Sequence, residues 1–136
     1  MVPSDPKYLS VVRDVTARIG HIDGLSDDVV EQIKLAVDEA CANVIKHAYK
    51  GRTEMKITVK FKVGRGRFEV VIEDNGIKAD PETVKGRSLE DVRPGGLGVH
   101  FIKRTFDVFE FDGKKKVGNR LKLVKYLKER YEDRDS

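Results

Sequence analysis

The chain has 136 residues, a length that suits one domain. Its formal net charge of +4 is spread diffusely along the sequence, and this spread disfavours direct binding of nucleic acid. No apolar stretch approaches the roughly 20 residues of a membrane span, and the single cysteine, Cys41, excludes an internal disulfide. We therefore expect one cytoplasmic domain over residues 1–136 that does not insert into a membrane.

Two amphipathic helices are predicted in the first part of the chain. The first covers residues 5–20, where apolar side chains recur at helical spacing. Its apolar positions are Tyr8, Val11, Val12, Val15 and Ile19. Ser26 can cap a second helix that continues to about Tyr49 and stops before Gly51. The predicted buried stripe of this helix is Val30, Ile33, Val37, Ala40, Val44 and Ala48.

The rest of the chain predicts two β-hairpins, separated by an irregular segment and a short helix at 99–106. The predicted strands cover residues 55–63, 68–73, 108–111 and 119–127. Residues 77–95 lack apolar periodicity and have glycines at both ends, which is typical of a functional lid. The polar tail 128–136 is expected to fray. This order predicts an α/β two-layer sandwich, with helices on one face of a largely antiparallel mixed sheet.

A row of polar side chains lies beside the buried stripe of the second helix. Glu39, Asn43 and His47 stand at i, i+4 and i+8, so an α-helix places them on one ridge. Lys46 lies on a neighbouring row. A carboxylate, an amide, a cation and an imidazole thus point into one region. The spacing alone is equally compatible with a solvated helix face.

Two further motifs lie at the ends of predicted elements. Asp74-Asn75-Gly76 follows an apolar strand, where it could be an ordinary turn or a nucleotide contact. A buried carboxylate accepts hydrogen bonds, so Asp74 could select a ring with an exocyclic amino group, such as adenine, while Gly76 allows close approach. The run Gly95-Gly96-Leu97-Gly98 precedes a helix, where backbone N–H groups can face phosphate or simply give a flexible helix entry.

In this order, the three motifs resemble the ATP site of the GHKL superfamily over nearly the whole chain. In particular, the chain resembles the anti-sigma-factor serine-protein kinases. Residues 36–49 (AVDEACANVIKHAY) resemble that family's first box, and residues 95–103 (GGLGVHFIK) resemble its lid-to-helix segment. The resemblance implies a Bergerat ATP-binding fold and gives each matching position an expected role.

The second helix is expected to carry the catalytic and metal-binding groups. The resemblance implies that Glu39 is the general base, acting on the acceptor hydroxyl directly or through water. Asn43 would ligate Mg²⁺ through its amide oxygen, with phosphates and waters as the remaining ligands. Lys46 matches a phosphate-contacting position, and His47 would border the nucleotide.

The other two motifs are expected to bind the adenine and the phosphates of ATP. Asp74 would accept the adenine amino group, with Gly76 beside it. Within the run Gly95-Gly96-Leu97-Gly98, Gly96 and Gly98 would approach the phosphates. Asn119 lies where the family usually has a hydroxyl residue near the adenine.

Two departures from the family pattern leave the nucleotide affinity open, and a third concerns the fold. Ile77-Lys78 follows Gly76 where a second glycine is often found, and residue 119 is Asn instead of Thr. The strand that usually precedes the first helix is missing or is reduced to residues 1–4.

Two functions follow from the resemblance. In the first, the protein is an ATP-dependent serine/threonine protein kinase that phosphorylates an anti-anti-sigma (STAS-type) partner, sequesters a sigma factor and forms a homodimer. In the second, it is a non-catalytic module that binds a sigma factor with ATP as a conformational ligand. Glu39 favours the kinase, because binding alone needs no general base.

Overall fold

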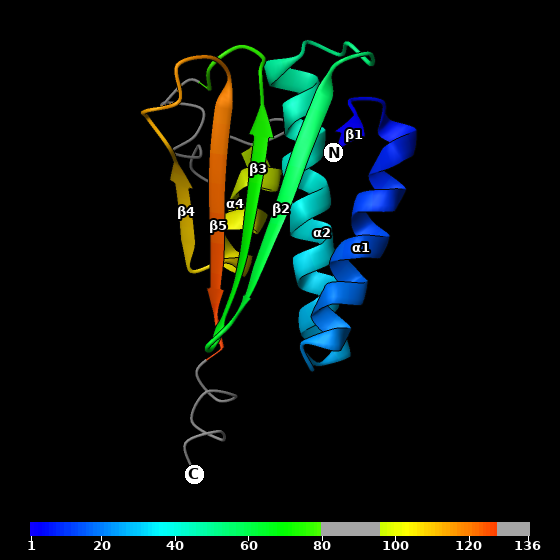
Figure 1. Ribbon diagram of the computed structural model, residues 1–136, viewed down its shortest axis with the longest axis vertical. Helices are drawn as coiled ribbons and strands as arrows, with labels where there is room; N and C mark the ends of the chain where they lie inside the picture. Colours follow the sequence, from blue (N-terminus) through cyan, green and yellow to red (C-terminus); the bar gives the residue numbers. More distant parts are fainter. Residues whose placement is uncertain (80–95, 128–136) are drawn as a thin grey trace.

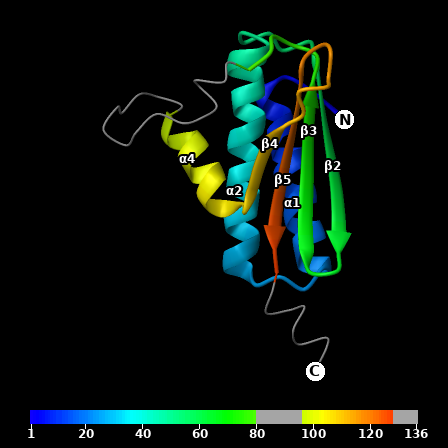
Figure 2. The same ribbon diagram turned by 90° about the vertical axis from the view of Figure 1, so that its left-hand side faces the viewer.

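A five-stranded sheet forms one layer of the protein and helices form the other (Figures 1 and 2). The computed structural model describes residues 1–79 and 96–127. The strands are β1 (Val2–Pro3), β2 (Lys56–Gly64), β3 (Arg67–Asp74), β4 (Val108–Phe111) and β5 (Asn119–Tyr126). The helices are η1 (Pro6–Tyr8), α1 (Leu9–Ile22), α2 (Asp27–Asn43), a π-helical segment η2 (Val44–Ala48) and α4 (Gly96–Thr105). The predicted two-layer α/β sandwich is confirmed.

The sheet has the strand order β1-β2-β3-β5-β4. Every pairing among the described strands is antiparallel, so the mixed character that the sequence predicted is not found there. The short β1 pairs with the start of β2, with Val2 opposite Ile57. The expected strand before the first helix is therefore present in reduced form. In the centre of the sheet, β3 pairs with β5 in a register that places Asp74 opposite Asn119.

The first helix turns a different face to the core from the one that the apolar pattern predicted. Val12 is buried as expected, but Val11 and Val15 are 47% and 42% exposed. Thr16 and Gly20 are buried instead. A Cβ on Gly20 would lie 3.0 Å from a methyl of Val30 on α2, so the small residues allow the two helices to approach closely. The close packing of α1 against α2 therefore stabilises the fold more than burial of Val11 and Val15 would.

The second helix follows the prediction at its start and departs from it near its end. The Ser26 hydroxyl accepts a hydrogen bond from the Val29 N–H, which caps the helix. All predicted stripe residues are buried except Val44, which is half-buried. After Asn43 the helix widens into the π-helical segment η2, and the Tyr49 N–H donates to the Val44 carbonyl five residues earlier.

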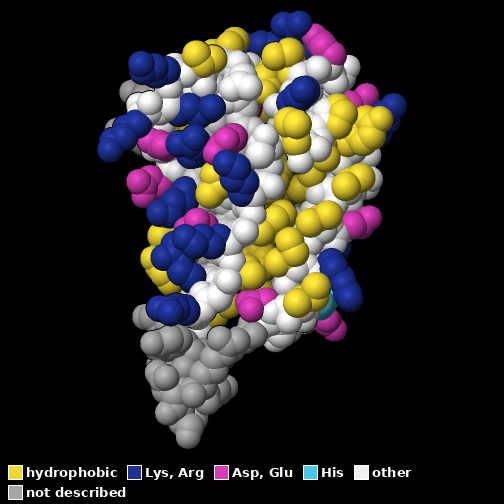
Figure 3. Space-filling model, in the orientation of Figure 1, with side chains coloured by type: hydrophobic (Ala, Val, Ile, Leu, Met, Phe, Trp, Pro, Cys, Tyr) yellow, Lys and Arg dark blue, Asp and Glu magenta, His cyan; other side chains and the backbone are white. Residues whose placement is uncertain are grey.

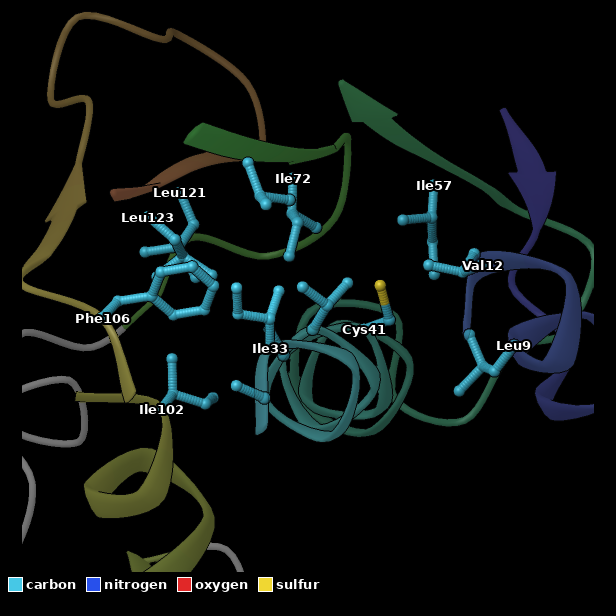
Figure 4. Packing of buried hydrophobic residues seen from close by; sticks show 14 of the residues in the cluster. Leu9, Val12, Ile33, Cys41, Ile57, Ile72, Ile102, Phe106, Leu121 and Leu123 are labelled. Carbon is cyan, nitrogen blue, oxygen red and sulfur yellow. The ribbon is translucent and has the colours of Figure 1, made fainter. Parts of the chain in front are cut away.

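The core lies between α2 and the sheet, with contributions from α1 and α4 (Figure 4). Ile33 of α2 lies near Ile72 and Leu123 of the sheet, while Cys41 points toward the side that holds Val12. Burial raises the pKa of the Cys41 thiol to about 12, so this side chain is an inert part of the core.

Parts of two predictions fall outside the described residues. The predicted lid, 77–95, is described only for its first three residues, and the tail 128–136 lies outside altogether. Among the helices that the structure describes, none has the length and apolar character needed to span a bilayer.

Candidate functional site

Glu39 and Asn43 stand one turn apart near the end of α2, and both side chains are half-buried. The α-helical geometry continues through Asn43, so the predicted i, i+4 relation between them holds. Within residues 1–79 and 96–127, neither side chain makes a hydrogen bond or an ion pair. A carboxylate and an amide oxygen are thus left available to a ligand in a partly enclosed place.

The start of α4 lies directly against the Glu39 carboxylate. A Cβ added to Gly98 would lie 2.1 Å from Glu39 Oε1 and 2.6 Å from its Cδ. Only a glycine therefore leaves Glu39 in its present position. The sequence predicted that Gly98 approaches phosphate, but it did not predict this contact. Gly96 and Leu97 form the first residues of α4, and Gly95 lies outside the described residues.

Lys46 and His47 lie in the π-helical segment η2 and are both exposed. The predicted ridge assumed α-helical spacing up to His47. The chain is π-helical over Val44–Ala48, so the α-helical i, i+4 geometry does not extend to His47, although the imidazole lies close enough to Glu39 to feel its charge. Desolvation lowers the pKa of the His47 imidazole, and the nearby Lys46 and Lys50 lower it further against the opposing charge of Glu39. The imidazole is therefore neutral at pH 7.

Asp74 ends β3 with its carboxylate facing the core side of the sheet, and it is only 3% exposed. Its Oδ1 accepts a hydrogen bond of 2.9 Å from the Gly76 N–H. The Asn119 Nδ2 group lies 3.1 Å from Oδ1 and 3.2 Å from Oδ2. Burial raises the pKa of Asp74, whereas these hydrogen bonds act in the opposite direction.

Gly76 is needed because the chain passes very close to the end of η2. A Cβ on Gly76 would lie 2.3 Å from the Ala48 carbonyl oxygen. The same oxygen accepts a hydrogen bond of 2.8 Å from the Ile77 N–H. This close approach joins the loop after β3 to the helix that carries Glu39 and Asn43. It also shows that Gly76 has a structural reason to be glycine, besides its predicted place near adenine.

Two residues that the sequence analysis missed hold this loop in place. The buried Tyr49 hydroxyl donates to the Lys56 carbonyl at 2.5 Å and accepts from the Asn75 N–H at 2.9 Å. Gly118 has a φ of +74°, and a Cβ there would lie 2.0 Å from the Asp74 carbonyl oxygen. The sequence offered one signal for each residue. Tyr49 is an aromatic residue with a hydroxyl group at the end of a helix, and Gly118 is a glycine directly before Asn119.

The described residues offer little for holding a metal without a nucleotide. No group of three or more His, Cys, Asp or Glu side chains in residues 1–79 and 96–127 could hold an ion. The free amide oxygen of Asn43 fits a Mg²⁺ ion that takes its other ligands from phosphates and water.

Comparison with known proteins places this geometry in a family. Residues 2–125 match the histidine kinase-like ATPase domain. The chain belongs to this family. Its relatives include serine-protein kinases RsbW of Listeria innocua (36% identical over 114 residues, covering 78% of this chain and 73% of the relative) and Staphylococcus aureus (31% identical over 136 residues, covering 93% and 84%). The RsbW of Bacillus subtilis is 27% identical over 143 residues, covering 99% of this chain and 88% of the relative.

Solved structures confirm the fold. The histidine kinase domain of a blue-light-activated histidine kinase from Erythrobacter litoralis superimposes with a TM-score of 0.60 at 18% identity, covering 96% of this chain and 64% of that one. Full-length ShkA in complex with AMPPNP superimposes with a TM-score of 0.56 at 14% identity, covering 88% of this chain and 29% of that one. The fold expected for a GHKL domain is thus confirmed, and the family match supports the same assignment.

Proposed function

We propose that this protein is an ATP-dependent serine/threonine protein kinase of the anti-sigma-factor type. The proposal is supported by the ATPase family match and by relatives named serine-protein kinases. The observation that carries it is the half-buried Glu39 carboxylate, which has no partner among the described residues and lies one turn from Asn43. A module that only binds has no need of such a group.

The adenine of ATP binds at the junction of β3 and β5. Asp74 accepts a hydrogen bond from the exocyclic amino group, and Gly76 lies beside the ring. This role is supported by the burial of Asp74, because a desolvated carboxylate discriminates strongly between a donor and an acceptor on the base. A guanine, which has a carbonyl at that position, would face the carboxylate with a lone pair.

The phosphates lie between the end of α2 and the start of α4. The Asn43 amide oxygen would hold a Mg²⁺ ion, and the ion would neutralise charge on the phosphates. Lys46 supplies a further cation, and the exposed position of its side chain allows it to reach outward. The N-terminal end of α4, which begins at Gly96 and includes Gly98, presents N–H groups to phosphate oxygens.

Phosphoryl transfer follows from this arrangement. Glu39 accepts the proton of a serine or threonine hydroxyl, directly or through one water, as the hydroxyl oxygen bonds to the γ-phosphorus. The bond from that phosphorus to the bridging oxygen breaks, and ADP leaves with the electron pair. Most of the acceleration comes from positioning and charge neutralisation, with about 10²–10⁴-fold from the base.

The partners are those of the anti-sigma-factor type: a sigma factor and an anti-anti-sigma (STAS-type) acceptor protein. A homodimer is supported by the apolar residues that α1 leaves exposed, which include Val11, Val15 and Ile22. Figure 3 shows apolar side chains gathered over the half of the surface that carries β2 and α1. Among the described strands, β2 beyond Ile57 is paired on one side only. A second copy of the chain could cover both features.

The test is incubation with Mg²⁺, γ-labelled ATP and a lysate from the source organism. We expect one small labelled acceptor that is absent when the Glu39→Gln variant replaces the wild-type chain. Nucleotide binding without any labelled acceptor, together with retention of a sigma factor, would favour the non-catalytic module instead. An unchanged melting temperature at millimolar Mg-ATP would contradict both, because a ligand at 100 times its Kd stabilises by about 2.7 kcal/mol.

A further inference from the structure

Asn119 makes more contacts than a residue that merely lines a nucleotide pocket. It lies opposite Asp74 across the β3–β5 pairing and is only 9% exposed. Its Nδ2 group faces both carboxylate oxygens of Asp74 and also the Ile77 carbonyl at 2.9 Å. Its Oδ1 accepts a hydrogen bond of 2.8 Å from the Ala79 N–H. One side chain thus joins a buried carboxylate to the backbone on both sides of Lys78.

These contacts determine how the amide is oriented. The carboxylate and the Ile77 carbonyl can only accept, so the NH₂ group must face them and the oxygen must face the Ala79 N–H. One N–H is shared between the two carboxylate oxygens, and the other goes to the Ile77 carbonyl. Both donors and the acceptor of the side chain are therefore used.

The two oxygens of Asp74 are left in unequal states. Oδ1 accepts from the Gly76 N–H and from the shared Asn119 N–H. Oδ2 accepts the longer half of the shared bond, at 3.2 Å, while the Asn119 backbone N–H also favours the ionised carboxylate. A carboxylate oxygen can accept about two hydrogen bonds. Oδ2 is consequently the oxygen with capacity for a further donor.

We propose that Asn119 is a positioning residue for nucleotide recognition, which holds Asp74 with Oδ2 available for the adenine amino group and fixes residues 77–79 to that carboxylate. This inference rests on the proposed function, because it names how the adenine end of the same site is held. It assigns Asn119 an indirect role, through Asp74, instead of a contact with the base.

The proposal also explains why two departures from the family pattern occur together. Ile77-Lys78 stands where the family often has a second glycine, and hydrogen bonds hold the backbone at these residues. The Ile77 N–H bonds to the Ala48 carbonyl, and the Ile77 carbonyl and the Ala79 N–H both bond to Asn119. A hydroxyl residue has one proton and could not donate to the carboxylate and to the Ile77 carbonyl at once. Asn119 can thus bond to the carboxylate and to this backbone at once, which a hydroxyl residue cannot.

The charge on Asp74 makes the pH dependence of ATP affinity a test of the proposal. A residue that only packed against Asp74 would not change this pH dependence. Burial raises the pKa of Asp74, and the hydrogen bonds from Gly76 and Asn119 lower it. The charged or titratable groups that face it are the Lys115 ammonium, which favours the ionised form, and the Tyr49 hydroxyl. Without the Asn119 donor, the pKa of Asp74 rises further. The loss of ATP affinity on acidification then begins at a higher pH.

The experiment uses the Asn119→Leu variant of the full chain, which removes the donor to Asp74 at similar volume, with Asn119→Ala as a second variant if the first does not fold. The matched control is Asn75→Leu, which makes the same change on an exposed neighbour whose side chain only faces Lys115. Amide exchange at Ala79 is measured without nucleotide, and ATP affinity is measured from pH 5 to pH 8.

We expect faster exchange at Ala79, a loss of ATP affinity of roughly fivefold at pH 7, and an affinity midpoint displaced to higher pH. The control should match the wild type in all three. Unchanged Ala79 exchange would overturn the link to residues 77–79, and an unchanged pH midpoint would overturn the positioning of Asp74. If the wild-type chain bound no ATP, the proposed function would fail together with the nucleotide half of this inference. Ala79 exchange would still decide the other half.

Discussion

The two ends of the site differ in how far they are assembled before any ligand arrives. At the adenine end, Asp74, Gly76 and Asn119 are joined by hydrogen bonds, and the Tyr49 hydroxyl holds the neighbouring backbone. At the phosphate end, the Glu39 carboxylate has no polar partner within the described parts of the chain. Under the proposed function, recognition would be built into the fold, whereas the chemical step would be completed by the ligand.

The difference has a structural origin. The adenine end lies where β3 and β5 pair, so backbone register fixes its members relative to one another. The phosphate end lies between two helices, α2 and α4, and depends on how their surfaces meet. Variants at the phosphate end should therefore affect turnover, while variants at the adenine end should affect binding and its selectivity.

The largest effect is expected from Glu39→Gln. Glutamine keeps the shape of the side chain but accepts no proton at neutral pH, so phosphotransfer should fall by about 10²–10⁴-fold. The affinity for Mg-ATP should change little, because the phosphates are held by other groups. Phosphotransfer is measured by single-turnover labelling of the acceptor, and binding by calorimetry. Turnover at the wild-type rate would refute the assigned base.

Asn43→Ala serves as the contrasting control for Glu39→Gln at the same end of the site. It removes the proposed metal ligand, so adding Mg²⁺ should increase the ATP affinity of the variant less than it increases that of the wild type. The loss should be at least about tenfold, since even groups that only support a metal ligand typically contribute 10–100-fold. If both variants lost activity with equal loss of binding, the separate roles of the two residues would be contradicted.

Gly98→Ala should reduce turnover with little effect on stability. The added methyl would lie 2.1 Å from Glu39 Oε1, and the flexible carboxylate end would have to move aside. A displacement of about 1 Å can cost on the order of 10²-fold in rate. Gly113→Ala is the matched control, because nothing lies within 4 Å of its added Cβ. Wild-type kcat in Gly98→Ala, with a normal melting curve, would show that the position of Glu39 does not matter.

Asp74→Asn should have the smallest of these effects and should act on binding. The amide loses the charge that strengthens the bond to adenine, which corresponds to about a tenfold loss of ATP affinity. The wild type should strongly prefer ATP to GTP, and the variant should prefer it less. Competition binding of both nucleotides to both proteins checks this expectation. Equal affinity of the wild type for ATP and GTP would exclude the role of Asp74.

Periodicity and turn chemistry predicted the sandwich and both hairpins, because those signals report which face of an element is buried. They failed where the outcome depends on contacts between elements. Val11 and Val15 are exposed because Gly20 allows α1 to approach α2 closely, and a count of apolar residues ignores glycine. The π-helical turn that carries His47 also has no signature in the spacing of residues.

The site residues divide in the same way. The pairing of Glu39 with Asn43 followed from α-helical spacing, and Asp74 followed from its place at a strand end. Gly118 and the contact between Gly98 and Glu39 depend on approaches between segments far apart in sequence. The registry of Asn119 with Asp74 could be expected near adenine only through family likeness. Its bonds to Ile77 and Ala79 depend on a backbone path that the sequence does not specify.

The hydrogen bond from the Ile77 N–H to the Ala48 carbonyl has a consequence for the order of folding. It links the end of the long helix to the loop after β3, at a separation of 29 residues. The adenine end therefore exists only after the hairpin has docked on the helix, which is a late, non-local event with a high entropic cost. A nucleotide that binds only the native state cannot stabilise the folding transition state, so it cannot accelerate folding. Saturating Mg-ATP should accordingly slow unfolding while leaving the refolding rate unchanged.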